Sequence, residues 1–140
     1  MTKKPPLLRD GGEAERRKRR SNNKLPKAHE KLVADAVGGK RVRGSGAFEE
    51  KGDVDREEGA YQFKIECKRT THESLGVQAA WLTKISDEAR SAGVHPALSI
   101  QFDKSVMAKI ARAADRAPAP EDWIAIPLHL FRDMLEALDE

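Results

Sequence analysis

The order of apolar and polar positions predicts helices and strands that follow one another along most of the chain. Apolar residues recur at helical spacing in some segments and alternate with polar residues in others, with glycine and proline between them. The predicted elements are, in chain order, a helix over 27–37, strands over 40–48, 53–56 and 61–68, a helix over 75–92, a strand over 98–102, a helix over 105–116, a strand over 123–126 and a helix that begins at Pro127. This order is typical of an α/β domain with a central mixed sheet flanked by helices.

Three of the predicted helices carry a stripe of apolar residues, and the stripe of the second should face inward. The stripes consist of Leu32, Val33, Ala36 and Val37 in the first helix, Leu75, Leu82, Ile85 and Ala89 in the second, and Leu128, Phe131, Leu135 and Leu138 in the last. The chain has 140 residues, of which 39% are hydrophobic. That is enough for one domain with its own core and too little for two ordinary domains.

Basic residues are concentrated in a short N-terminal segment. Residues 1–27 hold ten Lys and Arg against three acidic residues, while the remaining chain holds 16 basic and 20 acidic residues. The densest basic run is Arg16, Arg17, Lys18, Arg19 and Arg20. We therefore predict a disordered, DNA-binding arm over 1–25 and a globular domain over 26–140. A solvated tail without a partner and a nuclear import signal are the other interpretations of such a run.

Cysteine content and hydropathy exclude several classes of protein. Cys67 is the only cysteine, which excludes an internal disulfide framework and a zinc site of four cysteines. No apolar run is long enough to cross a bilayer, and Met1 is not followed by a signal-peptide pattern. These features predict a cytoplasmic protein without a membrane partner.

The strand predicted over 61–68 carries the most informative polar residues. Side chains alternate between the two faces of a strand, so Glu66 and Lys68 share one face and Cys67 lies on the other. Glu66 and Lys68 are then roughly 6–7 Å apart. A carboxylate and an ammonium at this spacing can reach the same phosphate group, the first through a metal ion and the second directly.

Asp53 lies in the preceding strand, and the loop length decides its position. A four-residue loop over 58–61 would place Asp53 opposite Glu66, with β carbons about 5 Å apart. A two-residue loop at 58–59 would place it opposite Lys64 and diagonal to Glu66. Both registers bring Asp53 and Glu66 to one face, where two carboxylates repel each other unless a cation lies between them. Oxygen ligands of this kind suit Mg²⁺ or Mn²⁺ better than zinc.

Further polar residues near these strands could complete a site that binds phosphate. Glu30 lies on the edge of the apolar face of the first helix and could reach the acidic residues from the side. Gln78 lies on the inward stripe of its predicted helix, where a polar residue should have a partner or a function. Residues that can hold a phosphate by charge, by a hydroxyl or by an unhindered backbone are Lys40, Arg41, Arg43, Gly44, Ser45, Arg69, Thr70 and Ser74.

Each of these features alone has an ordinary explanation. Glu and Lys two residues apart usually form a solvated strand face with a weak ion pair. An isolated aspartate before a turn usually serves the turn, and Cys67 on an apolar face is expected to be a core thiol. The hypothesis of a catalytic site depends on the order in which the features occur together.

In chain order, Glu30, Gly44-Ser45-Gly46, Gly52-Asp53, Glu66-Cys67-Lys68 and Gln78 resemble the motifs of the PD-(D/E)XK nuclease superfamily. More narrowly, the pattern is similar to the archaeal-type Holliday junction resolvases, including those carried by phages. The similarity covers roughly residues 27–102. It implies a restriction-endonuclease-like fold, a homodimer, and a location in the cytoplasm of a prokaryotic or phage-infected cell. The sequence departs from the family at Gly52, where proline is usual, and over 103–122, a long alanine-rich segment that leaves the dimer surface open.

The resemblance also implies roles for individual residues. Asp53 and Glu66 would be metal ligands, with the backbone carbonyl of Cys67 as a third. Lys68 would be the catalytic lysine, and Glu30 would complete the acidic site. Ser45 would assist catalysis or hold the phosphate, and Gln78 matches a glutamine found after the lysine motif in many relatives.

The expected function is therefore metal-dependent hydrolysis of DNA at four-way junctions, with Mg²⁺ or Mn²⁺ as cofactor and branched DNA as partner. A first alternative is another nuclease of the same superfamily, acting on single strands or resembling a nicking or restriction enzyme. A second is a non-catalytic nucleic-acid-binding protein, in which the acidic residues form ion pairs only.

Overall fold

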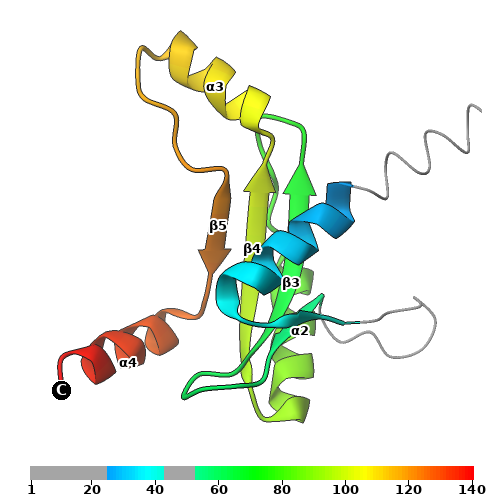
Figure 1. Ribbon diagram of the computed structural model, residues 1–140, viewed down its shortest axis with the longest axis vertical. Helices are drawn as coiled ribbons and strands as arrows, with labels where there is room; N and C mark the ends of the chain where they lie inside the picture. Colours follow the sequence, from blue (N-terminus) through cyan, green and yellow to red (C-terminus); the bar gives the residue numbers. More distant parts are fainter. Residues whose placement is uncertain (1–24, 43–52) are drawn as a thin grey trace, which may run out of the picture.

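A five-stranded sheet organises the part of the chain that the computed structural model describes, residues 25–42 and 53–140 (Figure 1). The elements are a helix over 25–37, β1 (Lys40–Arg41), β2 (Val54–Arg56), β3 (Phe63–Thr70), α2 (Ala79–Ala92), β4 (His95–Phe102), α3 (Lys104–Ala113), β5 (Asp122–Ala125) and α4 (Leu128–Leu138). The predicted fold class, a mixed sheet flanked by helices, is confirmed. None of the helices in the described ranges is long and apolar enough to span a bilayer.

The strands lie in the sheet in the same order as in the chain. β2 runs antiparallel to both β1 and β3, β4 runs parallel to β3, and β5 is antiparallel to β4. Parallel neighbours need a crossover connection, and α2 provides it between β3 and β4. The helix over 25–37 crosses in front of β3 and β4 in Figure 1, whereas α2 lies behind them.

Each face of the sheet has its own apolar layer because successive side chains of a strand point to opposite sides. On the first face, Val33 and Ala34 of the helix over 25–37 pack with Val54, Ile65 and Ala97, all at most 5% exposed. The opposite face is covered by α2. There the most buried residues are Ile85, Ala89 and Leu98.

Some predicted helix stripes differ from the buried ones. Leu82 was expected to face inward, yet it is 44% exposed. In the stripe of the first helix, Leu32 is also 44% exposed and Ala36 is exposed. The predicted helix over 75–92 begins only at Ala79, because the segment after β3 continues as an extended connection. Helical spacing identifies residues that share one face of a helix, but how much of that face is buried depends on the element that packs against it.

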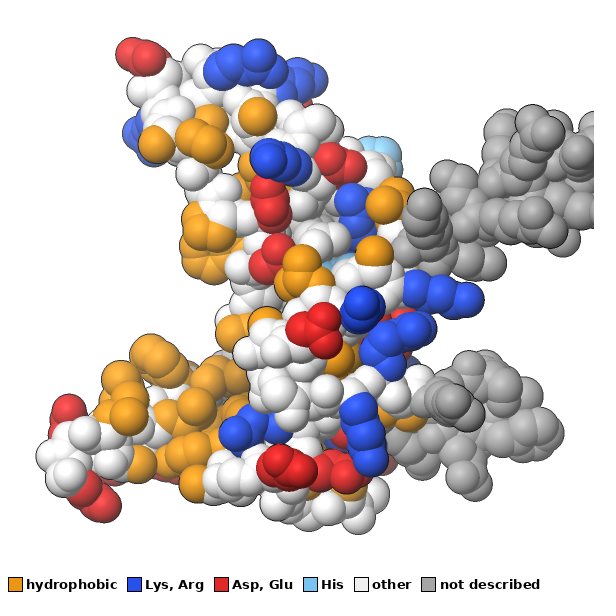
Figure 2. Space-filling view, viewed as in Figure 1, with side chains coloured by type: hydrophobic (Ala, Val, Ile, Leu, Met, Phe, Trp, Pro, Cys, Tyr) orange, Lys and Arg blue, Asp and Glu red, His pale blue; other side chains and the backbone are white. Residues whose placement is uncertain are grey.

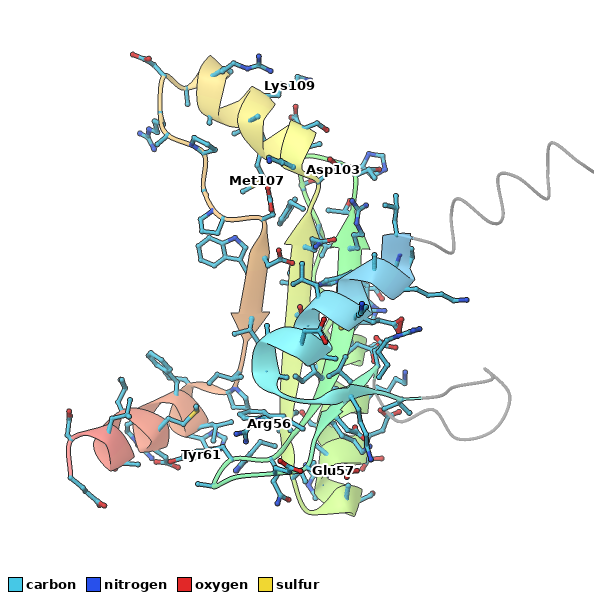
Figure 3. All side chains as sticks on the ribbon, in the orientation of Figure 1. Arg56, Glu57, Tyr61, Asp103, Met107 and Lys109 are labelled. Atoms are coloured by element: carbon cyan, nitrogen blue, oxygen red, sulfur yellow. The ribbon has the colours of Figure 1, made fainter. Side chains whose placement is uncertain are left out.

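The β2–β3 hairpin adopts the register expected for a four-residue loop over 58–61. Val54 lies opposite Ile65 and Arg56 lies opposite Phe63. The Arg56 guanidinium donates hydrogen bonds to the carbonyls of Glu58 and Tyr61 inside the loop, and its Nε donates to the carbonyl of Val37 at 2.9 Å (Figure 3). Gly59 takes a positive φ of 85° in the loop, a conformation that glycine adopts at little cost. These bonds fix the loop length and hence the position of Asp53.

Several predicted features lie outside the described residues. They are the basic arm with Arg16, Arg17, Lys18, Arg19 and Arg20, most of the strand expected over 40–48, and the loop residues Arg43, Gly44 and Ser45. These remain predictions from the sequence.

His29 connects the first helix to the centre of the sheet and makes the stability of the fold depend on pH. Its side chain is 2% exposed, and its Nε2 lies 3.1 Å from Ser99 Oγ. Burial lowers the pKa of His29, Asp122 opposes this effect, and Arg69 adds to it. The folded state therefore resists a proton that the unfolded chain accepts near its ordinary pKa of 6.5.

We predict that the free energy of unfolding falls as the pH is lowered from 7 towards 5. His29→Gln, which keeps a hydrogen-bonding side chain, should reduce this slope, and His29→Ala should cost about 1–3 kcal/mol by leaving the buried Ser99 unpaired. Urea unfolding followed by circular dichroism at several pH values measures both effects. An equal slope in the native chain and His29→Gln would contradict the prediction.

Candidate active site

β2 is shorter than β3, and the candidate site lies on the part of β3 that extends beyond its pairing with β2. The paired part of β2 begins at Val54, opposite Ile65, so that residues 66–70 of β3 continue past it. Asp53 lies at this point. Its N–H donates to the carbonyl of Ile65 at 2.8 Å, and its Oδ2 accepts the N–H of Cys67 at 2.7 Å. The Asp53 carboxylate is thereby placed against the β3 backbone between Glu66 and Lys68.

Glu66 and Lys68 share the face of β3 that α2 covers, as the alternation along the strand predicted. Lys68 Nζ lies 3.4 Å from Glu66 Oε1. Glu66 is 9% exposed, and its second oxygen lies 3.9 Å from Nζ of Lys84 in α2. A carboxylate this deeply buried needs compensating charge, and here two ammonium groups provide it.

An aromatic ring in the first turn of α2 holds the other side of the Lys68 ammonium. Lys68 Nζ lies 4.4 Å from the centre of the Trp81 ring. The face of an aromatic ring attracts a cation by about 0.5–2 kcal/mol, depending on solvent exposure. Lys68 is therefore fixed between Glu66 and Trp81, with 28% of its side chain exposed.

Glu30 approaches the same strands from the helix over 25–37. Its Oε2 lies 3.5 Å from Arg41 Nη2 in β1. Burial raises the pKa of Glu30, and the charges of Asp53 and Glu66 raise it further, while Arg41 acts in the opposite direction. Glu30 is thus close enough to the other two carboxylates to be repelled by them.

Cys67 is a core thiol, as its place on the apolar face predicted. The side chain packs against the cluster that contains Val54 and Ile65. Burial raises the pKa of the Cys67 thiol, with further contributions from the nearby carboxylates of Asp53, Glu30 and Glu66. Since the thiolate is the reactive form, this environment argues against a nucleophilic role.

The oxygen donors around β3 match Mg²⁺ or Mn²⁺ in type, although they are not arranged as a preformed metal site. In an extended strand the N–H and C=O of one residue point to the same side, so the carbonyl of Cys67 opens towards Asp53. With Asp53 and Glu66 it offers the hard oxygens that these ions prefer. Within the described ranges, however, no group of three or more His, Cys, Asp or Glu side chains is positioned to hold a metal ion. Binding would require Asp53 and Glu66 to exchange their present partners.

Among the other predicted site residues, Gln78 has different surroundings from those expected, and the phosphate-binding roles of Arg69, Thr70 and Ser74 stay predictions. Gln78 is not on a buried stripe. It is the exposed N-cap residue of α2, without a side-chain capping bond. Thr70 is 8% exposed, and its hydroxyl accepts the N–H of His72. Arg69 donates to Gln101 at 2.8 Å and lies 3.4 Å from Asp103, while Ser74 is exposed.

Lys40 and Arg41 remain accessible at the edge of the sheet. Lys40 pairs with Glu57 at 3.2 Å, and both side chains are more than half exposed. Arg41, which is bound to Glu30, is less exposed. An exposed ion pair of this kind contributes little, so Lys40 can exchange Glu57 for a phosphate at small cost.

Trp81, Lys84 and Glu88 belong to the site and were missed by the sequence reasoning. They follow one another at i, i+3 and i+7, which places them on one face of α2. Lys84 Nζ lies 3.9 Å from Glu88 Oε1, and Glu88 Oε2 is buried without a hydrogen-bond partner among the described residues. The combination of an aromatic, a basic and an acidic residue on one face was the available signal.

Because Glu30 is held in a repulsive environment, removing its charge should stabilise the fold. The raised pKa means that the folded state disfavours the ionised form, so stability is lost as the pH rises through the folded-state pKa of Glu30. We predict a small rise in melting temperature for Glu30→Gln at pH 7, and no rise below the ordinary pKa of 4.5. Calorimetry at both pH values tests this. A loss of stability at pH 7 would show that the pair with Arg41 outweighs the repulsion.

Comparisons with known proteins do not place the chain in a family. No protein-family model matches it, and no curated protein was found to be similar to it. Its function must therefore be inferred from the geometry around β3 and from the motifs in its sequence.

Proposed function

We propose that the protein is a divalent-metal-dependent endonuclease that hydrolyses phosphodiester bonds in branched DNA, with four-way junctions as the substrate. The observation that carries the proposal is the convergence at the middle of β3. Asp53 Oδ2 lies 2.7 Å from the amide nitrogen of Cys67, and Lys68 Nζ lies 3.4 Å from Glu66. The carboxylates of Asp53 and Glu66 and the ammonium of Lys68 thus all lie at residues 66–68 of β3.

The residues would divide the reaction between them. Asp53, Glu66 and the carbonyl of Cys67 would hold Mg²⁺ or Mn²⁺, and Glu30 would add negative charge from the side. The bound ion would supply Lewis-acid stabilisation of the charge that develops on the phosphate. Lys68 would donate a hydrogen bond to the attacked phosphate group or to the attacking water, and Trp81 would keep its ammonium in place.

Recognition would depend on the phosphate backbone and on DNA shape. Lys40 lies at the accessible edge of the sheet, and the basic arm over 1–25 adds many further cations. Contacts of this kind release counterions and make affinity salt-dependent without reading the bases. Cutting two opposed strands of a junction needs two sites, which a homodimer would provide. A nicking or restriction-like nuclease remains the alternative within the same chemistry.

One observation favours a second candidate, a nucleic-acid-binding protein without catalysis. Glu66 is already neutralised by Lys68 and Lys84, and Asp53 already accepts a backbone N–H. In such a protein these contacts would serve stability alone. Addition of Mg²⁺ separates the two candidates, because an enzyme converts the DNA whereas a binding protein only retains it.

The central test is a cleavage assay on a labelled four-way junction with Mg²⁺ or Mn²⁺. We expect Asp53→Asn, Glu66→Gln and Lys68→Ala each to lower the cleavage rate by about 10²–10³-fold or more, because each removes a group that acts in the transition state. Junction binding in a gel-shift assay should be largely kept, and EDTA should stop the reaction.

Asp55→Asn is the matched control for these variants. Asp55 pairs with Lys64 at 3.0 Å on the same two strands, two positions along the hairpin from Asp53 and Glu66. This variant should cut at close to the native rate. Native activity in any of the three site variants, or cutting that persists in EDTA, would overturn the proposed mechanism. Flap, nicked and linear duplex substrates in the same assay distinguish a resolvase from related nucleases.

Trp81 should affect the rate through the position of Lys68. Loss of a cation–π contact of about 0.5–2 kcal/mol corresponds to a rate that is about 2- to 30-fold lower. We predict this loss in kcat for Trp81→Leu, with KM unchanged, and substantial retention for Trp81→Phe, which keeps an aromatic face. Single-turnover cleavage measures the effect. Equal rates for Trp81→Leu and the native chain would remove Trp81 from the site.

A further inference from the structure

α4 leaves its broader apolar stripe uncovered. Leu130, at 2% exposure, is the residue by which α4 is anchored to the body, and the carbonyl of Asp133 accepts a bond from the Tyr61 hydroxyl at 3.5 Å. The apolar face predicted for this helix lies on another side of it. Its residues are between 45% and 82% exposed: Leu128, Phe131, Leu135 and Leu138. These residues form the apolar face that the sequence predicts, but this face does not join the core, because α4 projects away from the sheet (Figure 1).

The apolar surface continues from α4 onto β5. Trp123 and Ile124 are both 52% exposed. They point to opposite sides of the sheet, but β5 is its last strand within the described residues, so the two side chains flank the same sheet edge. Figure 2 shows apolar side chains gathered over α4 and along this side of the molecule, which is hollowed between α3 and α4. We refer to the exposed edge of β5, with Trp123 and Ile124 on its two sides, together with the α4 stripe, as the β5–α4 face.

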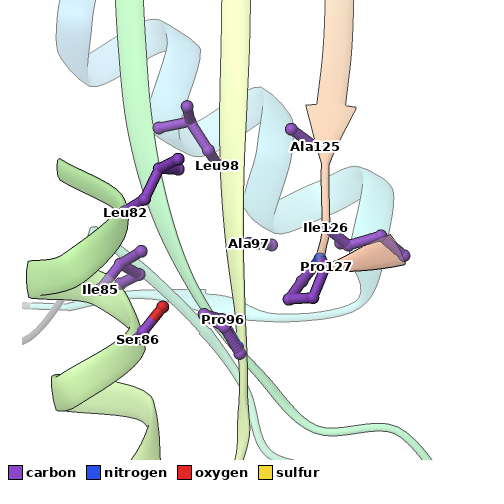
Figure 4. A pocket seen from close by; sticks show the side chains of 9 residues that line it. All are labelled: Leu82, Ile85, Ser86, Pro96, Ala97, Leu98, Ala125, Ile126 and Pro127. Carbon is purple, nitrogen blue, oxygen red and sulfur yellow. The ribbon is translucent and has the colours of Figure 1, made fainter. Parts of the chain in front are cut away.

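A hollow of about 200 Å³ opens where β5 passes into α4. It is lined mainly by apolar residues, among them Ile85, Leu98, Ala125 and Pro127 (Figure 4). An apolar cavity of about 150 Å³ is large enough to bind benzene, so this hollow can accept a large apolar side chain. The same end of the molecule therefore offers both protruding apolar side chains and a recess of matching chemistry.

The β5–α4 face has the size of the centre of a protein interface. From the sizes of such side chains, its six exposed apolar residues present on the order of 600 Å². The largest apolar patch of a typical monomer is about 300–600 Å², and a stable interface buries about 800 Å² on each partner, polar rim included.

The charge around α4 and the spacing of its apolar residues indicate what covers the β5–α4 face. α4 carries Asp133 and Glu136, and two further acidic residues follow it directly, against one arginine and one histidine. This acidic balance disfavours DNA and anionic lipid surfaces. The N-terminal arm is polar and lacks apolar periodicity, so it has little with which to cover the stripe. Leu128, Phe131, Leu135 and Leu138 are spaced by three, four and three residues, as in helix seams that pair with copies of themselves. Two-fold contacts are self-complementary in this way.

We infer that the β5–α4 face packs against the same face of a second copy of this chain. Each α4 then covers the exposed stripe of its partner, and the exposed β5 residues are buried beside it. The inference locates the interface of the homodimer in the proposed function, but it stands on apolar exposure and can be tested without nuclease activity.

Sedimentation equilibrium of the full chain at micromolar concentrations is the first test. We expect a mass of twice 15.6 kDa for the native chain and a mass close to one chain for the double variant Phe131→Glu, Leu135→Glu. Leu32→Glu is the matched control, because Leu32 is similarly exposed but lies in the helix over 25–37; it should remain dimeric. Circular dichroism should show the same helix content in all three proteins.

Cross-linking gives a second test that does not depend on the folding of the charged variant. Leu135→Cys should form a covalent dimer with a short bismaleimide linker, whereas Leu32→Cys should not, with Cys67 changed to Ser in both. A monomeric native chain, or equal cross-linking of the two variants, would overturn the inference. A dimer that does not cut DNA would overturn only the proposed nuclease, and a monomer that cuts DNA would overturn only the interface.

Discussion

The hydrogen bond from the Cys67 N–H to the Asp53 carboxylate is the contact on which the candidate site depends. It forms because the β2–β3 hairpin fixes Val54 opposite Ile65 and the ladder ends there. A shift of the hairpin by one residue would turn Asp53 to the opposite face and remove it from β3. The register in turn depends on Arg56, whose guanidinium holds the loop carbonyls of Glu58 and Tyr61. A loop contact at one end of the hairpin therefore positions a carboxylate at the other.

The charge around β3 is balanced by residues that would have to change partners during function. Three carboxylates approach one strand, and Lys68, Lys84 and Arg41 supply the cations that offset them. The raised pKa of Glu30 shows that, for this residue, burial and repulsion outweigh the compensation. A divalent cation would relieve this repulsion and release Lys68 for a phosphate. The same contacts without an ion would describe a stable but inactive protein, which is why metal-dependent turnover decides between the two candidates.

Sequence reasoning succeeded where the chemistry was local. The alternation over 61–68 correctly separated Glu66 and Lys68 from Cys67. The loop length left two hairpin registers open, and the structure has one of them, the register with a four-residue loop. It failed where a distant neighbour decides. Gln78 was expected inside a helix, but the chain stays extended until Ala79. Ser45, another predicted site residue, lies outside the described residues. Trp81 and Lys84 reach β3 from a crossover helix whose position the sequence does not specify.

The stripe on α4 illustrates a limit of the same reasoning and links the two proposals. A helix stripe that packs on its own core and one that packs on a second copy have the same spacing and composition, so only the tertiary structure distinguishes them. Two strands separate the candidate site on β3 from the outer edge of β5. If two β5 edges met directly, the β3 strands would lie about 24 Å apart at a spacing of about 4.8 Å per strand, and intervening α4 helices would increase this. Sites so far apart cannot act on one phosphate. They would be spaced to act on two separate strands, as the proposed cutting of a branched substrate requires.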